Sequence, residues 1–336
     1  MKRLLNVRIR ELKTPILVGS VLTIVFIVTG FFSGCPNTSG RKPTGSTGGN
    51  NTPAVTPGPY VKVSYADLET YLRDTASSEK LNYIEVTGLI PKEAFKGSDD
   101  NPGALGQKLK DHSDKKVALK IAAYPAGLTS MENCFAGCKS LTTTPAIPEG
   151  VTDMGWCFLG CTSLTTAPDI PAGVTVMSGC FQDCESLTTA PAIPESVTDM
   201  SNCFASCKNL TRAPAIPKDV TDMERCFQDC TSLTTVPNIP VGLTNMTNCF
   251  YGCTSLTTVP DIPASVTDMG YCFYACTKLT GVTLNCNYSA GKFDSAFTNC
   301  GNLADGSIKV PQDQLDKYKA GAGDMGTAKE KFAAIQ

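Results

Sequence analysis

A 23-residue period runs through the centre of this 336-residue chain and constrains its fold more than any other feature. Seven methionines recur at that interval without an insertion, at Met131, Met154, Met177, Met200, Met223, Met246 and Met269. A fixed period of about 20 to 50 residues is typical of a solenoid, in which each repeat forms one coil that packs against its neighbours. The chain is therefore expected to be a repeat solenoid over residues 126–303, with seven full repeats and a degenerate eighth.

Each methionine opens the same pattern, roughly M-x-x-C-F-x-x-C-x-x-L-T-x-x-P-x-I-P. The Met, the two Cys and the Phe are spaced i, i+3, i+4 and i+7, which predicts a short helical turn with these four side chains facing inward. Six of the seven residues before the methionines are Ser, Asp or Asn, which favours a capped turn. The Leu-Thr segment then predicts a short strand, and the prolines end it because they lack a backbone N–H.

Two columns of cysteine follow from this pattern. They are Cys134, Cys157, Cys180, Cys203, Cys226, Cys249 and Cys272 in the first, and Cys138, Cys161, Cys184, Cys207, Cys230, Cys253 and Cys276 in the second. Cysteine packs well as a small buried residue. Stacked coils also bring Cα atoms within disulfide range, so the pattern leaves buried thiols and a disulfide ladder both open. Metal binding is not expected, because the spacing follows a core-facing turn and lacks clustered His or acidic partners.

The segments on either side of the repeats are expected to cover the ends of the solenoid. Residues 60–125 predict a small α/β cap, with helices over 65–74 and 103–111 and strands at 84–86 and 117–121. Residues 304–336 predict a C-terminal cap, with an extended segment at 308–311 and a helix near 327–334.

The N-terminus has the order of a secretory leader. A basic stretch precedes an apolar run of about 17 residues, which also lies at the lower limit for a membrane-spanning helix. The run ends in Phe32-Ser33-Gly34-Cys35, which resembles the lipobox of bacterial lipoproteins. That resemblance implies a signal peptide over residues 1–34 and lipidation of Cys35, with an uncleaved anchor or simple secretion as alternatives. Residues 35–59 are almost all Pro, Asn, Thr, Ser and Gly, which predicts a disordered tether.

The repeats resemble the bacterial leucine-rich repeats of the BspA type, most specifically in the segment Cys-x-x-Leu-Thr. The resemblance implies a leucine-rich repeat fold and a surface protein that adheres to host matrix components or other bacteria. It also implies a place in the bacterial cell envelope, lipid-anchored and exposed on the outer membrane. A protein or glycan partner is therefore expected, with the membrane reached through the lipid.

Composition excludes other classes of function. The net charge is −2, which argues against a nucleic-acid partner, and the one histidine, His112, argues against histidine-based catalysis. His112 is expected to be solvated. No paired acids, nucleophile with a base, or phosphate loop stands out, so no enzyme activity, cofactor or small-molecule substrate is expected. A cell-surface adhesion or binding protein is the leading hypothesis, and a structural surface-layer component without a specific ligand is the alternative.

Four aromatic residues break the regularity of the repeats on the side expected to face outward. Trp156, Tyr251, Tyr271 and Tyr274 occupy positions that hold Ala, Gly, Asn, Arg or Gln in other repeats. Clustered exposed aromatics are candidate ligand contacts, whereas packing against the caps would explain them without a ligand.

Overall fold

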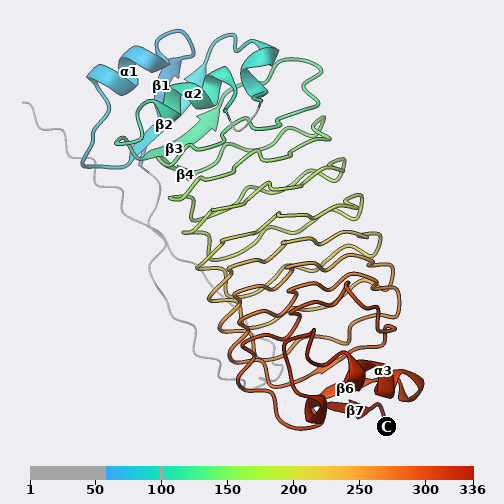
Figure 1. Cartoon of the computed structure of the whole chain (residues 1–336). Helices are drawn as coiled ribbons and strands as arrows, with labels where there is room; N and C mark the ends of the chain where they lie inside the picture. The colour runs from blue at the N-terminus through green and yellow to red at the C-terminus, as the bar shows by residue number, and fades with distance from the viewer. Residues whose placement is uncertain (1–57, 99–100) are drawn as a thin grey trace, which may run out of the picture. The chain divides into compact units, whose positions relative to one another are not determined.

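The computed structural model describes residues 58–98 and 101–336 (Figure 1). The predicted signal peptide, Cys35 and nearly all of the predicted tether therefore lie outside the described residues. Among the residues that are described, no helix is long and apolar enough to cross a membrane.

The segment that precedes the repeats is an α/β unit, as its periodicity predicts. Its elements are β1 (Val61–Ser64), α1 (Leu68–Asp74), β2 (Asn82–Thr87), the 3-10 helix η1 (Lys92–Phe95), α2 (Ala104–Lys110) and β3 (Val117–Ile121). Helix α1 begins three residues later than predicted because Ser64 and Asp67 close a turn ahead of it. The Ser64 hydroxyl accepts the Asp67 N–H at 3.1 Å and donates to the Asp67 carboxylate at 2.6 Å.

The sheet of this unit continues into the first repeat. β1, β2, β3 and β4 (Leu141–Thr143) form one parallel sheet in that order, and β4 belongs to the repeat that opens at Met131. From there the chain winds into stacked coils, seen in green through orange in Figure 1. We number the coils 1 to 7 by their opening methionines, from Met131 to Met269.

The helical turn predicted in each repeat is not a helix but a series of tight turns. In coil 2, the N–H groups of Cys157 and Cys161 donate to the carbonyls three residues earlier, each at 3.1 Å. The N–H groups of Trp156 and Phe158, on either side of Cys157, donate instead to carbonyls of coil 3, each at 2.9 Å. A helix would keep all of these bonds within the coil, whereas this alternation joins each coil to the next.

Two residues per coil adopt the left-handed conformation that such turns require. In coil 2 they are Trp156, with φ of 51°, and Gly160, with φ of 68°. The residue before most of the methionines makes the predicted capping bond, although the segment that it caps is a turn and not a helix. The carboxylate of Asp153, for example, accepts the N–H of Gly155, two residues on, at 3.0 Å. The same bond recurs at Asp199, Asp222 and Asn245.

Among the described coils, the predicted strand reaches three residues only in coil 1, as β4. In several later coils the contact is reduced to isolated bridges such as Thr143 to Thr166 and Arg212 to Thr235. The prolines that follow cannot donate to a neighbouring coil, so the ladder stops there. A second row of bridges, absent from the sequence-based prediction, pairs the residues that precede the methionines from Ser130 to Asp268.

The interior is a set of filled columns. Every Met, Cys, Phe and Leu of the repeat pattern in coils 1 to 7 is fully buried. The phenylalanine rings from Phe135 to Phe297 stack with centroids 5.6–5.8 Å apart and nearly parallel planes. Since offset aromatic pairs are favourable at this separation, the rings reinforce the hydrogen bonds between coils.

The C-terminal segment adds a second small parallel sheet, in the order β5-β6-β7. Its elements are β5 (Val282–Thr283), β6 (Ile308–Val310), the 3-10 helix η2 (Gln312–Gln314), α3 (Leu315–Ala320), the 3-10 helix η3 (Lys329–Lys331) and β7 (Phe332–Ala334). The helix predicted near 327–334 is wrong: η3 and β7 occupy that segment. Phe332 is buried against Phe297, the last ring of the stack, and against Tyr318.

Candidate functional site

Three of the four aromatics singled out from the sequence lie together. The rings of Tyr251 and Tyr274, in coils 6 and 7, are parallel with centroids 4.8 Å apart. Tyr271 is tilted against Tyr274, with centroids 6.1 Å apart, and is 44% exposed. We call these three residues the tyrosine cluster. Their phenol groups form an amphipathic, partly exposed patch at the C-terminal end of the coils.

Tyr271 occupies a backbone position that does not favour a tyrosine. Its φ is 56°, in the left-handed region, where coils 1, 4 and 6 place asparagine and coil 3 places glycine. A bulky residue there costs on the order of 1–2 kcal/mol. The cluster therefore includes a ring at a position where the backbone favours asparagine or glycine.

Trp156 is separate from the tyrosine cluster. It lies in coil 2, four coils away from Tyr251, and its indole covers Gly179 of coil 3. A Cβ at Gly179 would lie 2.3 Å from the indole Cδ1 and Nε1 atoms, so only glycine leaves room for the ring. Trp156 is thus half-buried against its own solenoid.

The two cysteine columns are buried side by side in the core. All sixteen described cysteines are free thiols, and only Cys300 is partly exposed. Each thiol of the second column from coil 2 onward donates to the carbonyl of the phenylalanine 26 residues earlier, as Cys207 does to Phe181 at 3.2 Å. Burial raises the pKa of these thiols far above the ordinary value, which keeps them protonated and poorly nucleophilic.

Several threonines of the repeat columns use their hydroxyls within the solenoid. The Thr234 hydroxyl donates to the Thr211 carbonyl at 2.9 Å, and the Thr280 hydroxyl donates to the Thr257 carbonyl at 3.0 Å. A parallel row before the methionines does the same, for example from Thr244 to Thr221 at 3.0 Å. Because the protons of these hydroxyls are already bonded, these rows tie coils together.

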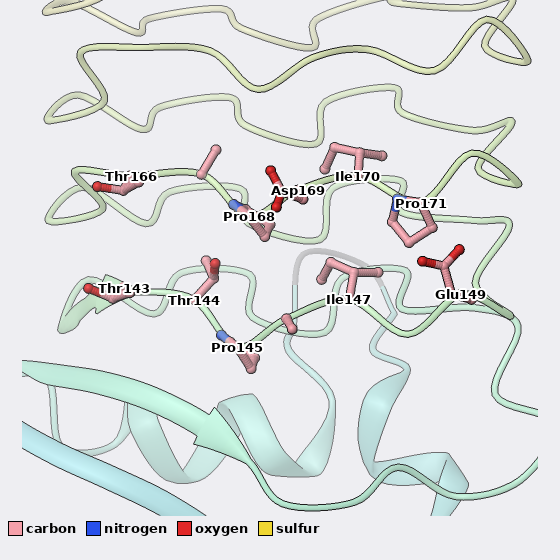
Figure 2. A pocket seen from close by; sticks show the side chains of 12 residues that line it. Thr143, Thr144, Pro145, Ile147, Glu149, Thr166, Pro168, Asp169, Ile170 and Pro171 are labelled. Atoms are coloured by element: carbon pink, nitrogen blue, oxygen red, sulfur yellow. The ribbon is translucent and has the colours of Figure 1, made fainter. Parts of the chain in front are cut away.

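A groove of about 560 Å³ lies beyond the strand segments of coils 1 and 2. Figure 2 shows its walls, which are the T-x-x-P-x-I-P segments of the two coils, with Ile147 and Ile170 on the same side of each. Two acids, Glu149 and Asp169, are among its lining residues. From the sequence the prolines were expected only to end strands, and this groove was not predicted.

Two further expectations from the sequence concern metal binding and His112. Within residues 58–98 and 101–336, no group of three or more His, Cys, Asp or Glu side chains is placed to hold a metal ion. The expectation that His112 is solvated is wrong: its Nε2 lies 2.8 Å from the Glu69 Oε1 of α1, and its side chain is 14% exposed. That pair joins helix α1 to the end of α2.

Comparison with known families gives a direct match to the repeats. A model described as the BspA type leucine rich repeat region matches in six copies over residues 114–234 and 200–319, which together span more than half of the chain. The chain belongs to the BspA-type leucine-rich repeat family. As a member of it, the chain is a repeat protein whose stacked coils present an extended surface of the kind that binds other proteins.

Solved bacterial structures are similar to this BspA-type chain at low sequence identity. A leucine-rich repeat protein of Treponema pallidum is 22% identical, with a TM-score of 0.42 over 63% of this chain and 87% of that one. One from Bacteroides ovatus is 20% identical, with a TM-score of 0.39 over 68% and 85%. A leucine-rich cell surface protein of Faecalibacterium prausnitzii is 20% identical, with a TM-score of 0.27 over 59% and 80%. No curated protein matches the chain.

Proposed function

We propose that this BspA-type protein is a surface lipoprotein of the bacterial envelope that binds a protein or glycan partner through its C-terminal coils. The tyrosine cluster carries the proposal. Rigid aromatic rings with a polar tip bury a large area on binding at a small loss of entropy, which is why tyrosine is frequent at binding hot spots. Here three of them gather within two adjacent coils, and one holds an unfavourable backbone conformation.

The cluster can be removed with residues that the chain itself uses at the equivalent positions. Tyr251 and Tyr274 align with Gln182 and Gln228, and Tyr271 aligns with Asn248. A triple variant, Tyr251→Gln, Tyr274→Gln and Tyr271→Asn, should therefore fold as the parent does. We expect it to lose at least about thirtyfold in binding to immobilised host matrix proteins or to whole bacteria, about 2 kcal/mol, with an unchanged melting temperature.

The control is Gln182→Ala, which alters the same column in coil 3, away from the cluster. Equal binding by the triple variant and the control would contradict the proposal and move the binding site elsewhere on the solenoid, whereas no binding by the parent protein would favour a structural component without a specific ligand. A large fall in melting temperature in the triple variant would instead assign the rings to packing.

Anchoring at Cys35 is the second part of the proposal, and it rests on the lipobox-like junction Phe32-Ser33-Gly34-Cys35. A lipid on this cysteine would hold the protein at a membrane surface, with the tether between the lipid and the solenoid. In detergent phase partitioning, the parent should enter the detergent phase and Cys35→Ala the aqueous phase. A Cys35→Ala variant that stays in the detergent phase would support an uncleaved helical anchor.

A further inference from the structure

The isoleucine of the P-x-I-P segment has its backbone groups paired by the next coil in two places. The Ile216 N–H donates to the side-chain oxygen of Asn238 at 3.1 Å, and the Asn238 side-chain nitrogen donates to the Ile216 carbonyl at 2.9 Å. At Ile262, extended backbone does the same: Thr283 accepts the N–H and Asn285 donates to the carbonyl, both at 2.8 Å. One carboxamide side chain therefore replaces a stretch of β-strand.

In the described chain, four equivalent isoleucines lack such a partner. Opposite Ile147 and Ile239 the residue of the next coil that aligns with Asn238 is an aspartate, whereas opposite Ile170 and Ile193 it is an alanine. In the described part of the chain, the structure records no hydrogen bond to the backbone N–H or C=O of Ile170 or Ile193. The residues that align with Asn238 are Ala192 and Ala215, which are exposed and have no group that could reach back. We call the backbone N–H and C=O pairs of Ile170 and Ile193 the open amide sites.

The surface around these sites is hollowed. A groove of about 290 Å³ is lined by Ala215 together with Pro214 and Pro237, and the larger groove of Figure 2 includes Ile170. Proline removes competing donors from these walls, and alanine has no polar side-chain group that could pair with the isoleucine amides. A ligand amide can therefore replace water there without displacing a protein group.

We propose that the open amide sites bind Asn or Gln side chains of a partner polypeptide, each amide pairing with one isoleucine as Asn238 pairs with Ile216. The two sites are one coil apart, in coils 2 and 3, whose stacked rings Phe158 and Phe181 have centroids 5.6 Å apart. Side chains at i and i+2 of an extended strand are about 6.6 Å apart on one face. A partner strand running along the solenoid with Asn or Gln at alternate residues therefore comes within about 1 Å of this spacing.

This inference rests on the proposed role in partner binding but uses a surface distinct from the tyrosine cluster. The test uses the full-length protein labelled with ¹⁵N at isoleucine and the capped peptide acetyl-Thr-Asn-Thr-Asn-Thr-amide. We expect saturable shifts of the Ile170 and Ile193 amide signals and none of the Ile216 signal, whose partner is already in place. The peptide with Ala in place of both Asn should bind at least tenfold more weakly.

Three variants make the test specific. Ala192→Asn and Ala215→Asn supply the missing side chain in cis, so each should abolish the response of its own isoleucine, Ile170 or Ile193. Asn238→Ala should make Ile216 responsive. The triple tyrosine variant should respond as the parent does, which separates this site from the cluster.

Several outcomes would overturn the assignment. Equal shifts with the Asn and Ala peptides would show that the sites do not distinguish a carboxamide side chain from a methyl group. Unchanged Ile170 and Ile193 signals at millimolar peptide would show that the peptide does not displace water from these sites. Stronger shifts from an N-acetylated oligosaccharide than from the peptide would assign the sites to a glycan instead.

Discussion

Gly179 and Trp156 show how single residues adjust an otherwise uniform coil. Both occupy the first left-handed position of their coils, with φ of 60° for Gly179 and 51° for Trp156. The Trp156 indole lies against the Cα of Gly179, which carries no side chain. The Trp156 indole thus requires glycine at this position of the next coil. The same position holds Asn, Arg and Tyr elsewhere, so the column tolerates side chains only where the neighbouring coil leaves room.

We predict that Gly179→Ala lowers the free energy of unfolding by about 2–4 kcal/mol, because the new Cβ meets the indole and also has a positive φ. In a Trp156→Asn background the clash is gone, and the cost should fall to about 1–2 kcal/mol. A double-mutant cycle by urea denaturation measures both values. The same cost in both backgrounds would mean that the indole does not lie on Gly179.

The turn element shows which part of the fold the sequence predicts. The spacing of Met154, Cys157, Phe158 and Cys161 correctly identifies the inward side chains but not the backbone, because successive tight turns place the same residues inward as a helix does. What separates the two is a pair of left-handed residues, four positions apart, in each coil. Asn and Gly at several of these positions are the signal that could have revealed it.

The cysteine columns are an element whose chemistry depends on burial. Burial raises the pKa of a thiol such as Cys207, so the folded protein keeps its proton at a pH where the unfolded chain would lose it. Stability from this source is complete below about pH 8.5, the ordinary thiol value, and is lost as the pH rises above it. Each such thiol changes the free energy of unfolding by about 1.4 kcal/mol per pH unit in that range.

We therefore predict that the protein is equally stable from pH 6 to 8 and loses stability steeply above pH 9 in denaturant titrations. The double variant Cys203→Ala and Cys207→Ala, with both changes in one coil, should reduce the slope of the unfolding free energy against pH by the contribution of about two protons. Thiol titration with a chromogenic disulfide should detect almost no reactive cysteine in the native protein at pH 8. Rapid reaction of many native thiols would contradict the burial argument.

The whole solenoid behaves as one continuous core, which the strict period predicts correctly. The tyrosine cluster was partly predictable, because Tyr251 and Tyr274 occupy the same column of adjacent repeats. The open amide sites were not. Their existence depends on which backbone groups lack a hydrogen-bond partner. Ala192 stands at the position where coil 5 has Asn238, and an alanine in a sequence does not reveal that the isoleucine amide of the preceding coil lacks a partner.

We predict that Phe204→Ala, in the central coil, costs about 3–5 kcal/mol, since it interrupts the ring stack on both sides. Hydrogen exchange should then show reduced amide protection in coils 3, 4 and 5. Lys218→Ala in the same coil is the control, because Lys218 is exposed and should change stability by less than about 0.5 kcal/mol. Loss of protection confined to coil 4 would mean that the coils are energetically separate.

The alternating turn bonds have a mechanical consequence. Every second N–H of the turn segment donates to the following coil, so these bonds run in the stacking direction. A force that separates the two ends of the described segment loads them in tension, one coil boundary at a time. Each coil that detaches releases 23 residues, or about 75–80 Å of extended chain, in place of one stacking interval. Under load the protein would lengthen in equal steps, and each step would dissipate energy before the next boundary opens.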